Sequence, residues 1–326
     1  RTVVSRSQHL SQPFIEALQH SLAHGEQSML YLNRRGTARI ILCDQCGWQA
    51  LCPHCDLPLT YHADSHDIVC HSCNFRGPAP ITCPICSNPS IVYKSAGTKS
   101  IVDEVQRLFP EARVQRFDTD NLKADRLEQH YGAIVAGDVD ILVGTQLLAK
   151  GLDLPRLSTL GVIMADSSLA MPDFTSQERT YQLLSQVLGR VGRGHRDSVA
   201  IIQTYNASSP SIQAALHDNW TDFYAQELRE REKFAFPPFF FLLKLTAKRS
   251  TAKAAESTAS KLRSSLLATH QGIIIEGPAP SFHEKQTGKY EWQLVVKTKN
   301  RSALLAVIHD LPTSGWSYDI DPINLL

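Results

Sequence analysis

The chain contains eight cysteines, and all of them belong to Cys-x-x-Cys pairs within one short segment. Two thiolates at this spacing can bind one tetrahedral zinc ion from a tight turn, so four pairs supply the ligands of two four-cysteine sites. A disulfide scaffold is the alternative, but it is typical of short secreted chains. This chain has 326 residues, shows no signal peptide and has no cysteine elsewhere, which indicates a reducing, cytoplasmic compartment. The sequence therefore predicts two zinc ions per chain.

The intervals between the pairs indicate which cysteines share a metal. The turn-like segment Ala63–His66 lies between two short apolar stretches and predicts a hairpin that returns the third pair to the second. A sequential pairing would have to fold two turns together across five residues, so we favour a nested one. The first site then comprises Cys43, Cys46, Cys83 and Cys86, and the second comprises Cys52, Cys55, Cys70 and Cys73. Four histidines nearby are expected to be exposed loop residues: His54, His62, His66 and His71.

Around the cysteines, strand-length apolar runs alternate with helical stretches. At this length two domains are expected, and 43% hydrophobic residues is enough for substantial cores. The runs suit a parallel sheet that is buried on both faces, which predicts an α/β domain of the mononucleotide-binding type with the zinc module inserted after its first strand. The predicted strands are 29–32, 114–117, 141–143, 160–164 and 199–202, and the predicted helices are 13–22, 99–109, 122–135 and 176–188.

The periodicity changes after Tyr205. Residues 210–235 are predicted to form one charged helix, which Pro237-Pro238 ends. The remaining order of strand, helix, two strands, helix and strand is typical of the split βαβ, ferredoxin-like α+β arrangement. We therefore expect four parts: an α/β lobe over 1–42 and 91–205, a zinc module over 43–90, a helical linker over 206–236 and a C-terminal domain over 237–326.

The distribution of charge is more informative than its total, which is +1. Residues 237–326 hold eleven Lys and Arg against seven Asp and Glu, whereas the zinc module holds Arg76 against four aspartates. The C-terminal domain is thus the better candidate for binding DNA through a basic face, with Tyr290 and Trp292 available to stack on bases. The residues expected on this face are Lys244, Lys248, Arg249, Lys297, Lys299 and Arg301. The alternative is that the lysines form an ordinary solvated surface and that Trp292, in an apolar alternation, belongs to the core.

An arginine motif forms the strongest signal after the cysteines. In Gln186-Val-Leu-Gly-Arg190-Val-Gly-Arg193, at a predicted helix end, two guanidinium groups can face phosphate oxygens that gain charge during phosphoryl transfer. Upstream, Gly144-Thr145-Gln146 closes a strand and precedes Lys150-Gly151-Leu-Asp153. A strand that ends in small and hydroxylated residues is where an open α/β sheet places its ligand.

Together these segments resemble motifs V and VI of the second, RecA-like lobe of superfamily 2 helicases. With the cysteine insertion, Asn33-Arg34-Arg35-Gly36 and the terminal Asp319-Ile-Asp321-Pro322, the whole chain resembles the replication-restart helicases. The resemblance implies arginine fingers at Arg190 and Arg193, nucleotide sensing by Gln186, Gly151 and Asp153, and DNA contacts by Thr145, Gln146 and Lys150. A helix cap is the alternative for Thr145, and a solvated charge for Lys150. The sequence departs from the family pattern at Thr37, Leu188 and Val191, which leaves every charged group in place.

One departure is larger, because the chain contains neither a Walker A sequence nor an Asp-Glu-x-His box. The groups that bind ATP and Mg²⁺ must then lie on a preceding lobe, and the chain alone is expected not to hydrolyse ATP. The resemblance further implies a monomeric, nucleoid-associated bacterial protein. It implies 3′ to 5′ movement, and as partners forked and single-stranded DNA, primosome proteins and single-stranded-DNA-binding protein, with no membrane.

Two other functions remain open at this stage. One is a non-enzymatic zinc-ribbon module that binds DNA or protein on an α/β scaffold. An arginine pair beside Gly144-Thr145 argues against it, because a binding module has no need of such a pair there. The other is a different superfamily 2 motor, such as an RNA helicase, against which the nested cysteines argue.

Overall fold

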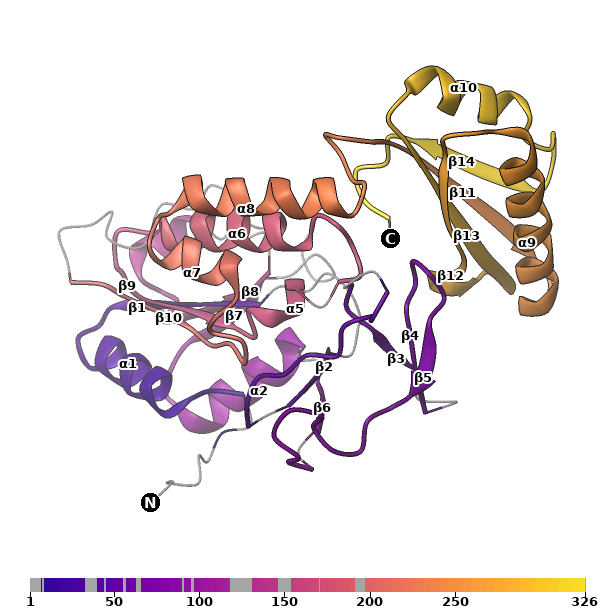
Figure 1. Cartoon of the computed structure of the whole chain (residues 1–326). Helices are drawn as coiled ribbons and strands as arrows, with labels where there is room; N and C mark the ends of the chain where they lie inside the picture. The colour runs from indigo at the N-terminus through magenta and orange to yellow at the C-terminus, as the bar shows by residue number, and fades with distance from the viewer. Residues whose placement is uncertain are drawn as a thin grey trace. The chain divides into compact units, whose positions relative to one another are not determined.

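The structure, a computed structural model, divides the chain into two compact units (Figure 1). Unit 1 comprises residues 1–38, 94–169 and 178–219, and unit 2 comprises residues 39–93, 170–177 and 220–326. The structure describes residues 7, 9–32, 40–43, 45–54, 57–62, 66–89, 91–94, 97–117, 131–145, 154–169, 171–190 and 197–325.

A five-stranded sheet forms the centre of unit 1. Its strand order is β10-β9-β1-β8-β7, and every pair within it is parallel. Since β1, β8 and β9 are buried at every position, the sheet is covered on both faces, as the continuous apolar runs predicted. The strands are β1 (Gln27–Leu32), β7 (Val114–Phe117), β8 (Ile141–Gly144), β9 (Leu157–Ile163) and β10 (Val199–Ile202).

Helices lie on both sides of this sheet (Figure 1). Helices α1 (Gln12–Ala23) and α2 (Thr98–Leu108) lie on one side, and α6 (Ser176–Leu188) lies on the other. A short helix, α5 (Asp166–Leu169), follows β9, where the Asp166 carboxylate accepts hydrogen bonds from Thr204, Tyr205 and Asn206 after β10. The predicted helix at 122–135 falls largely outside the described residues, which show only its end, over 131–136.

Phe14 and Gly161 set how closely α1 approaches the sheet. The Phe14 ring is fully buried, and a Cβ atom added at Gly161 on β9 would lie 1.8 Å from its Cζ atom. Only a glycine at this point of the strand therefore lets the ring reach the sheet.

Replacing Gly161 by alanine is expected to destabilise unit 1 by about 2 kcal/mol, because a methyl group forced against a packed ring moves the helix or the strand. Urea unfolding of the variant and the parent would measure the change. Gly132→Ala is the matched control, since it lies in a helical turn with nothing within 4 Å of an added Cβ atom. Equal stability of the two variants would contradict this account of α1.

Two small sheets build the zinc module in unit 2. Strands β2 (Ile40–Cys43) and β6 (Ile91–Lys94) pair with each other, so the two ends of the insertion meet. Strands β3 (Thr60–His62), β4 (Asp67–Val69) and β5 (Arg76–Pro78) form an antiparallel meander. The β3–β4 hairpin agrees with the predicted one, and it carries the chain from the second cysteine pair back to the third.

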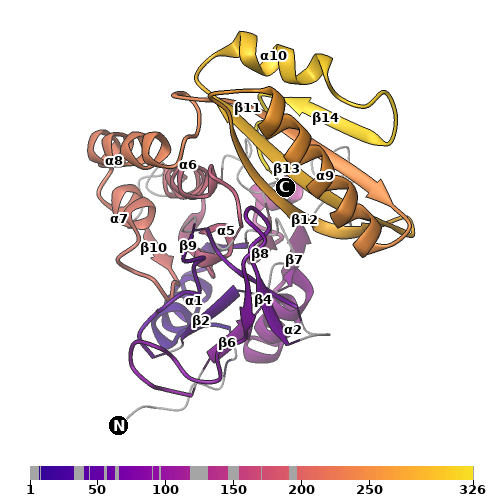
Figure 2. The same cartoon turned by 45° about the vertical axis from the view of Figure 1, so that its right-hand side comes forward.

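The C-terminal part of unit 2 is an antiparallel sheet with the strand order β12-β13-β11-β14. Helices α9 and α10 pack on one side of it, against Trp292, Leu294 and Val296 of β13 (Figure 2). We call this side the core face and the opposite side the second face. The elements are β11 (Phe241–Arg249), α9 (Ala252–Thr269), β12 (Ile274–Gln286), β13 (Lys289–Thr298), α10 (Arg301–His309) and β14 (Trp316–Ile320).

The single helix predicted over 210–235 is wrong. Helix α7 (Pro210–Leu216) ends at His217, and helix α8 (Trp220–Lys233) starts three residues later. Asp218 between them has a positive φ of 51°, and the Asn219 N–H group turns back to the Ala214 carbonyl group at 2.9 Å. This left-handed residue ends a helix, and neither charge nor apolar periodicity revealed it.

No helix in the described part of the chain is both long enough and apolar enough to cross a membrane.

Candidate functional site

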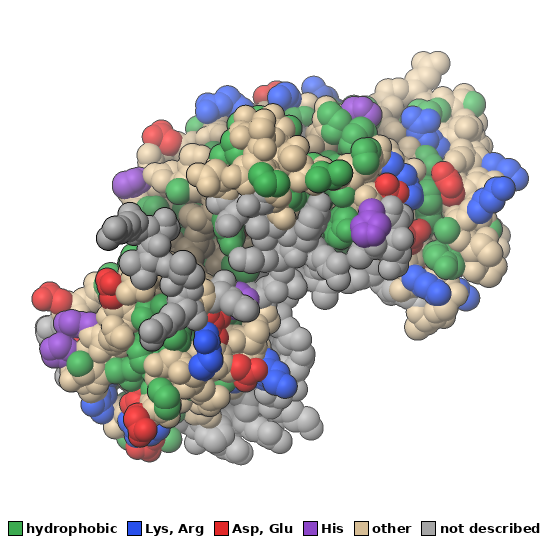
Figure 3. Space-filling view, turned by 90° about the horizontal axis from the view of Figure 1, so that it is seen from below, with side chains coloured by type: hydrophobic (Ala, Val, Ile, Leu, Met, Phe, Trp, Pro, Cys, Tyr) green, Lys and Arg blue, Asp and Glu red, His purple; other side chains and the backbone are tan. Residues whose placement is uncertain are grey.

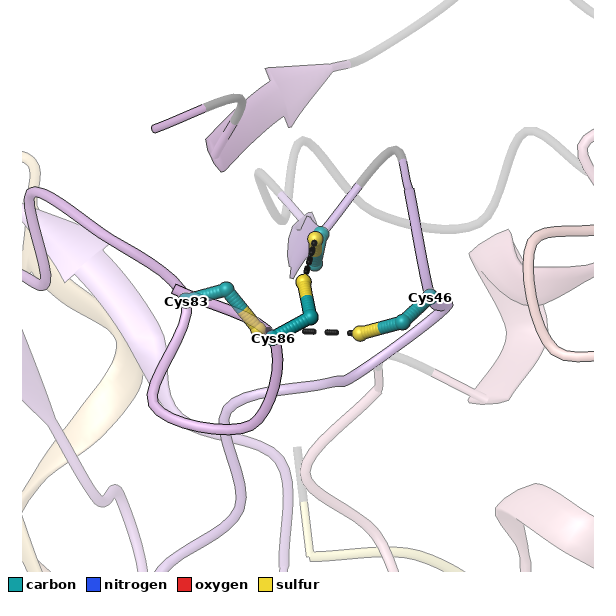
Figure 4. A group of neighbouring side chains, drawn as sticks. Cys46, Cys83 and Cys86 are labelled. Carbon is teal, nitrogen blue, oxygen red and sulfur yellow. Dashed lines mark hydrogen bonds between the residues drawn. The ribbon is translucent and has the colours of Figure 1, made fainter. Parts of the chain in front are cut away.

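The first cysteine site brings together all four of its predicted ligands. The Sγ atoms of Cys43 and Cys86 are 3.5 Å apart, and those of Cys46 and Cys83 are 3.6 Å apart. All four sulfur atoms lie within 4.8 Å of one another, and the labelled side chains converge in Figure 4. Because Zn–S bonds are about 2.3 Å long, the edges of a tetrahedral four-sulfur site are about 3.8 Å. The sulfur spacing therefore fits a zinc ion.

Charge on the sulfurs of this site also favours a bound cation. Burial opposes ionisation of Cys83, but N–H groups of Cys86 and Ile85 point at its sulfur, and its pKa is lowered to about 7. The Asn88 N–H group favours the Cys86 thiolate, yet burial and the sulfurs of Cys43, Cys46 and Cys83 outweigh it and raise its pKa to about 12. The Cys83 and Cys86 thiols thus differ strongly in how readily they ionise, and a divalent cation bound between them would stabilise the thiolate form of both.

The second cysteine site has three described ligands, since Cys55 lies outside the described residues. The sulfur atoms of Cys52, Cys70 and Cys73 lie within 4.8 Å of one another, and those of Cys52 and Cys73 are 3.5 Å apart. Together with the first site, this grouping is the nested one that the intervals predicted. The structure corrects the prediction of exposed loop histidines at two positions. His71, between Cys70 and Cys73, is only 3% exposed, and His62 is half-buried in strand β3.

Three of the cysteine pairs adopt the same backbone turn conformation, which positions their sulfur atoms for metal binding. After each pair comes a residue with positive φ: Gly47 at 74°, Asn74 at 63° and Ser87 at 58°. Its N–H group donates to the carbonyl oxygen of the pair's first cysteine, at 2.9 to 3.0 Å. These bonds fix the two sulfurs of a pair on the same side of the turn, in position to bind one ion.

The arginine motif begins at the end of α6. Gln186 is exposed, Arg190 is partly buried, and Arg193 lies outside the described residues. A Cβ atom at Gly189 would lie 3.1 Å from the Ser185 carbonyl oxygen, closer than usual, which explains a glycine before the arginine. The Arg190 N–H group closes this last turn on the Val187 carbonyl oxygen at 3.1 Å.

Thr145 follows the carboxyl end of β8 and is 3% exposed, with its N–H group donating to the Phe117 carbonyl oxygen at 3.1 Å. The other predicted residues of this segment, Gln146, Lys150, Gly151 and Asp153, lie outside the described residues.

The arginine motif does not lie beside Gly144-Thr145, contrary to the sequence-based prediction. Strand β9 ends at the carboxyl edge of the parallel sheet, and β10 begins at the amino edge. Helix α6 connects them, so it runs back across the sheet and places Gln186 and Arg190 near the amino edge (Figure 1). Thr145 stands at the carboxyl edge, so the two segments serve different surfaces of the lobe.

The basic face predicted for the C-terminal domain is only partly exposed: Lys248, Lys299 and Arg301 are exposed, but other members are buried or half-buried. Trp292 is 2% exposed and belongs to the core, and Lys297 is fully buried. Burial lowers the pKa of Lys244, whose Nζ atom donates to the Leu325 carbonyl oxygen. Lys248 pairs with Glu291 at 2.7 Å, and Arg301 pairs with Asp321. Among the described residues visible in Figure 3, Lys and Arg side chains are scattered between other types.

Several buried polar residues of unit 2 were missed by the sequence reasoning. Asp173 accepts hydrogen bonds from the N–H groups of Thr175 and Leu325, at 2.8 and 2.6 Å. Ser72 and the partly buried Glu276 form a further network with Lys297, which had been predicted to belong to the basic face. None of the missed residues belongs to a motif or to a periodic pattern, so the sequence carried no signal for them.

Three family models match separate parts of the chain. The helicase conserved C-terminal domain matches residues 87–195, and the Cys-rich region (CRR) domain of PriA DNA helicase matches residues 52–78. The primosomal protein N C-terminal domain matches residues 232–323. The C-terminal domain of the DEAD-box protein Dbp5 aligns over 68% of this chain and 89% of that structure at 13% identity, but a TM-score of 0.32 is too low to support an argument.

Curated relatives extend the similarity over nearly the whole chain. Replication restart protein PriA of Bacillus subtilis is 38% identical over 90% of this chain and 37% of that protein. Its counterpart in Treponema pallidum is 35% identical over 97% of this chain and 50% of that protein. The chain thus spans half or less of the length of these two relatives. It belongs to the family of replication restart protein PriA and corresponds to the C-terminal part of its members.

Proposed function

We propose that the chain is the second lobe, with its zinc module and C-terminal domain, of an ATP-dependent 3′–5′ DNA helicase. The whole protein would recognise stalled or branched replication forks in the bacterial cytoplasm and start primosome assembly there. One observation supports this most: a parallel α/β lobe of the helicase type is interrupted after its first strand by a module in which eight cysteines occur at zinc-site spacing. That combination matches the PriA family and not a plain zinc-ribbon module.

The two surfaces of the lobe suggest a division of labour. Arg190 and Arg193 at the end of α6 would face ATP held by a preceding lobe and stabilise charge that develops on the transferred phosphoryl group. Gln186, Gly151 and Asp153 would sense the nucleotide and its Mg²⁺. Thr145, Gln146 and Lys150, after β8, would contact the DNA backbone.

Two zinc ions per chain are proposed, one for each nested group of cysteines. Such all-thiolate sites are closed and structural, so they would fold the module without taking part in a reaction. For the C-terminal domain, whose strand order supports a ferredoxin-like fold, we propose DNA binding. DNA would contact another, exposed surface of this domain, because the second face of its sheet is buried. Primosome proteins and single-stranded-DNA-binding protein are proposed partners of a monomeric enzyme.

A comparison of the 326-residue chain with the whole protein tests this function. The whole protein is expected to unwind a forked DNA with ATP, and the chain alone to hydrolyse no ATP, because it has no Walker A sequence. ATP hydrolysis measured with and without forked DNA, alongside strand separation, decides the point. A whole protein whose ATP hydrolysis ignores DNA would contradict the proposal, as would hydrolysis by the chain alone.

A further inference from the structure

The second face of the C-terminal sheet is buried although it carries polar residues. On β13 this face presents Glu291, Gln293, Val295 and Lys297, which are 7%, 3%, 1% and 0% exposed. An antiparallel sheet with helices on one side usually leaves such residues to water. Here Phe234, Phe236 and Leu325 cover part of the face, around Val295. The Cys70–Cys73 turn of the second zinc site covers another part.

Contacts between that turn and the sheet are polar and specific. The His71 Nδ1 atom donates to the Pro280 carbonyl oxygen at 2.9 Å, and the Gln293 Nε2 atom donates to the His71 carbonyl oxygen at 2.9 Å. The Ser72 hydroxyl group donates to the Glu276 carboxylate at 2.8 Å. The His71 ring also meets the Phe282 ring edge to face, 5.7 Å between centroids. Two residues between two metal ligands therefore make these contacts.

An ion pair between a fully buried lysine and a partly buried glutamate extends this network away from the zinc module. Glu276 accepts from Ser72 on one oxygen, and on the other it pairs with the Lys297 Nζ atom at 2.6 Å. The same Nζ atom donates to the Phe234 carbonyl oxygen at 2.8 Å and lies 3.7 Å from the centre of the Phe236 ring. A lysine that is fully buried requires such partners. The contacts thus run from the zinc turn to the segment that follows α8.

The sheet residues that receive the turn flank an irregularity in β12. Its pairing with β13 shifts between Glu276 and Ala279. Gly277, inside the shift, has a φ of 90°, and an added Cβ atom would lie 2.7 Å from the Gln293 carbonyl oxygen. Such bulges redirect side chains and carbonyl groups out of the regular ladder. The strand is therefore shaped where Glu276 and Pro280 meet the zinc turn.

We propose that the second zinc site is the latch of the C-terminal domain: its metal holds the Cys70–Cys73 turn in the shape that docks onto β12 and β13. The reason is local, because His71 and Ser72 each neighbour a metal ligand. Loss of the ion therefore frees the backbone that positions the His71 ring, the His71 carbonyl group and the Ser72 hydroxyl group for their three hydrogen bonds. Cys46 and Cys86 of the first site are exposed, so that site offers a contrast. The inference rests on the zinc binding proposed above.

Two cysteine variants of the 326-residue chain test the latch. Cys73→Ser should remove one zinc ion and speed hydrogen–deuterium exchange in β12 by about tenfold or more, because its docked face opens. Cys46→Ser should also remove one zinc ion but leave β12 exchange unchanged. Metal analysis of each protein comes first: a parent chain without two zinc ions overturns the zinc assignment itself. If the parent chain holds two zinc ions but β12 exchanges at the same rate in Cys73→Ser and Cys46→Ser, only the latch is overturned.

A third variant keeps both metal sites intact. Gln293→Leu removes the hydrogen bond to the His71 carbonyl oxygen, and it is expected to retain two zinc ions while β12 exchanges faster. This outcome separates docking from any general unfolding of the module in Cys73→Ser. Unchanged exchange in Gln293→Leu would show that the turn does not hold the domain.

Discussion

Arg190→Ala in the whole protein is expected to lower DNA-stimulated ATP hydrolysis by about 10³-fold or more, with little loss of DNA affinity. An arginine finger acts chiefly on the charge of the transition state, and such fingers are worth roughly this factor. The structure adds a reason for the separation of the two effects, because Arg190 lies near the amino edge of the sheet and Thr145 follows the carboxyl end of β8. Steady-state ATP hydrolysis and fluorescence-anisotropy binding to forked DNA would measure the two quantities.

Arg229→Ala is a suitable control for this experiment. Arg229 is exposed on α8, so its substitution removes the same charge at a different position. It is expected to leave both quantities close to those of the parent protein. If Arg190→Ala lost DNA affinity and turnover equally, the residue would be a DNA anchor and not a catalytic finger.

Cys52→Ser is expected to reduce the zinc content of the chain from two ions to one and to unfold the β3–β5 meander. Structural zinc sites contribute about 10 to 16 kcal/mol of apparent binding energy, which is also the folding energy of the loops they join. Cys52 is 2% exposed and packs with Leu59, Ile68 and Cys70, so the loss reaches the small core of the module. Metal analysis after purification without chelator gives the stoichiometry.

The nested pairing predicts that the remaining ion stays at the first site. A second change, Cys43→Ser, should then remove it, whereas a further change at Cys70 should not. A parent chain with one zinc ion, or with disulfides in its native state, would contradict the two-site assignment.

The sequence by itself determined the local elements and the cysteine grouping. Continuous apolar runs predicted the three central strands of the parallel sheet, because a strand buried on both faces needs apolar side chains at every position. The two edge strands, β7 and β10, were also predicted, although they are only partly buried. The interval between Cys55 and Cys70 was long enough for a hairpin, and this hairpin sets the nested order. Motif spacing identified the family. All of these features depend on residues that are close in sequence.

Only the tertiary structure decided which surfaces those elements expose. The direction of α6 across the sheet placed the arginine motif and Thr145 at opposite edges, although the sequence had been interpreted as placing the arginine pair beside Gly144-Thr145. Lys297 looked like part of a basic surface, but Glu276, Phe234 and Phe236 enclose its ammonium group from three different segments. His71 was predicted to be an exposed loop residue, but it is buried against β12 and β13. Burial of a polar side chain depends on partners distant in sequence, and no local pattern encodes them.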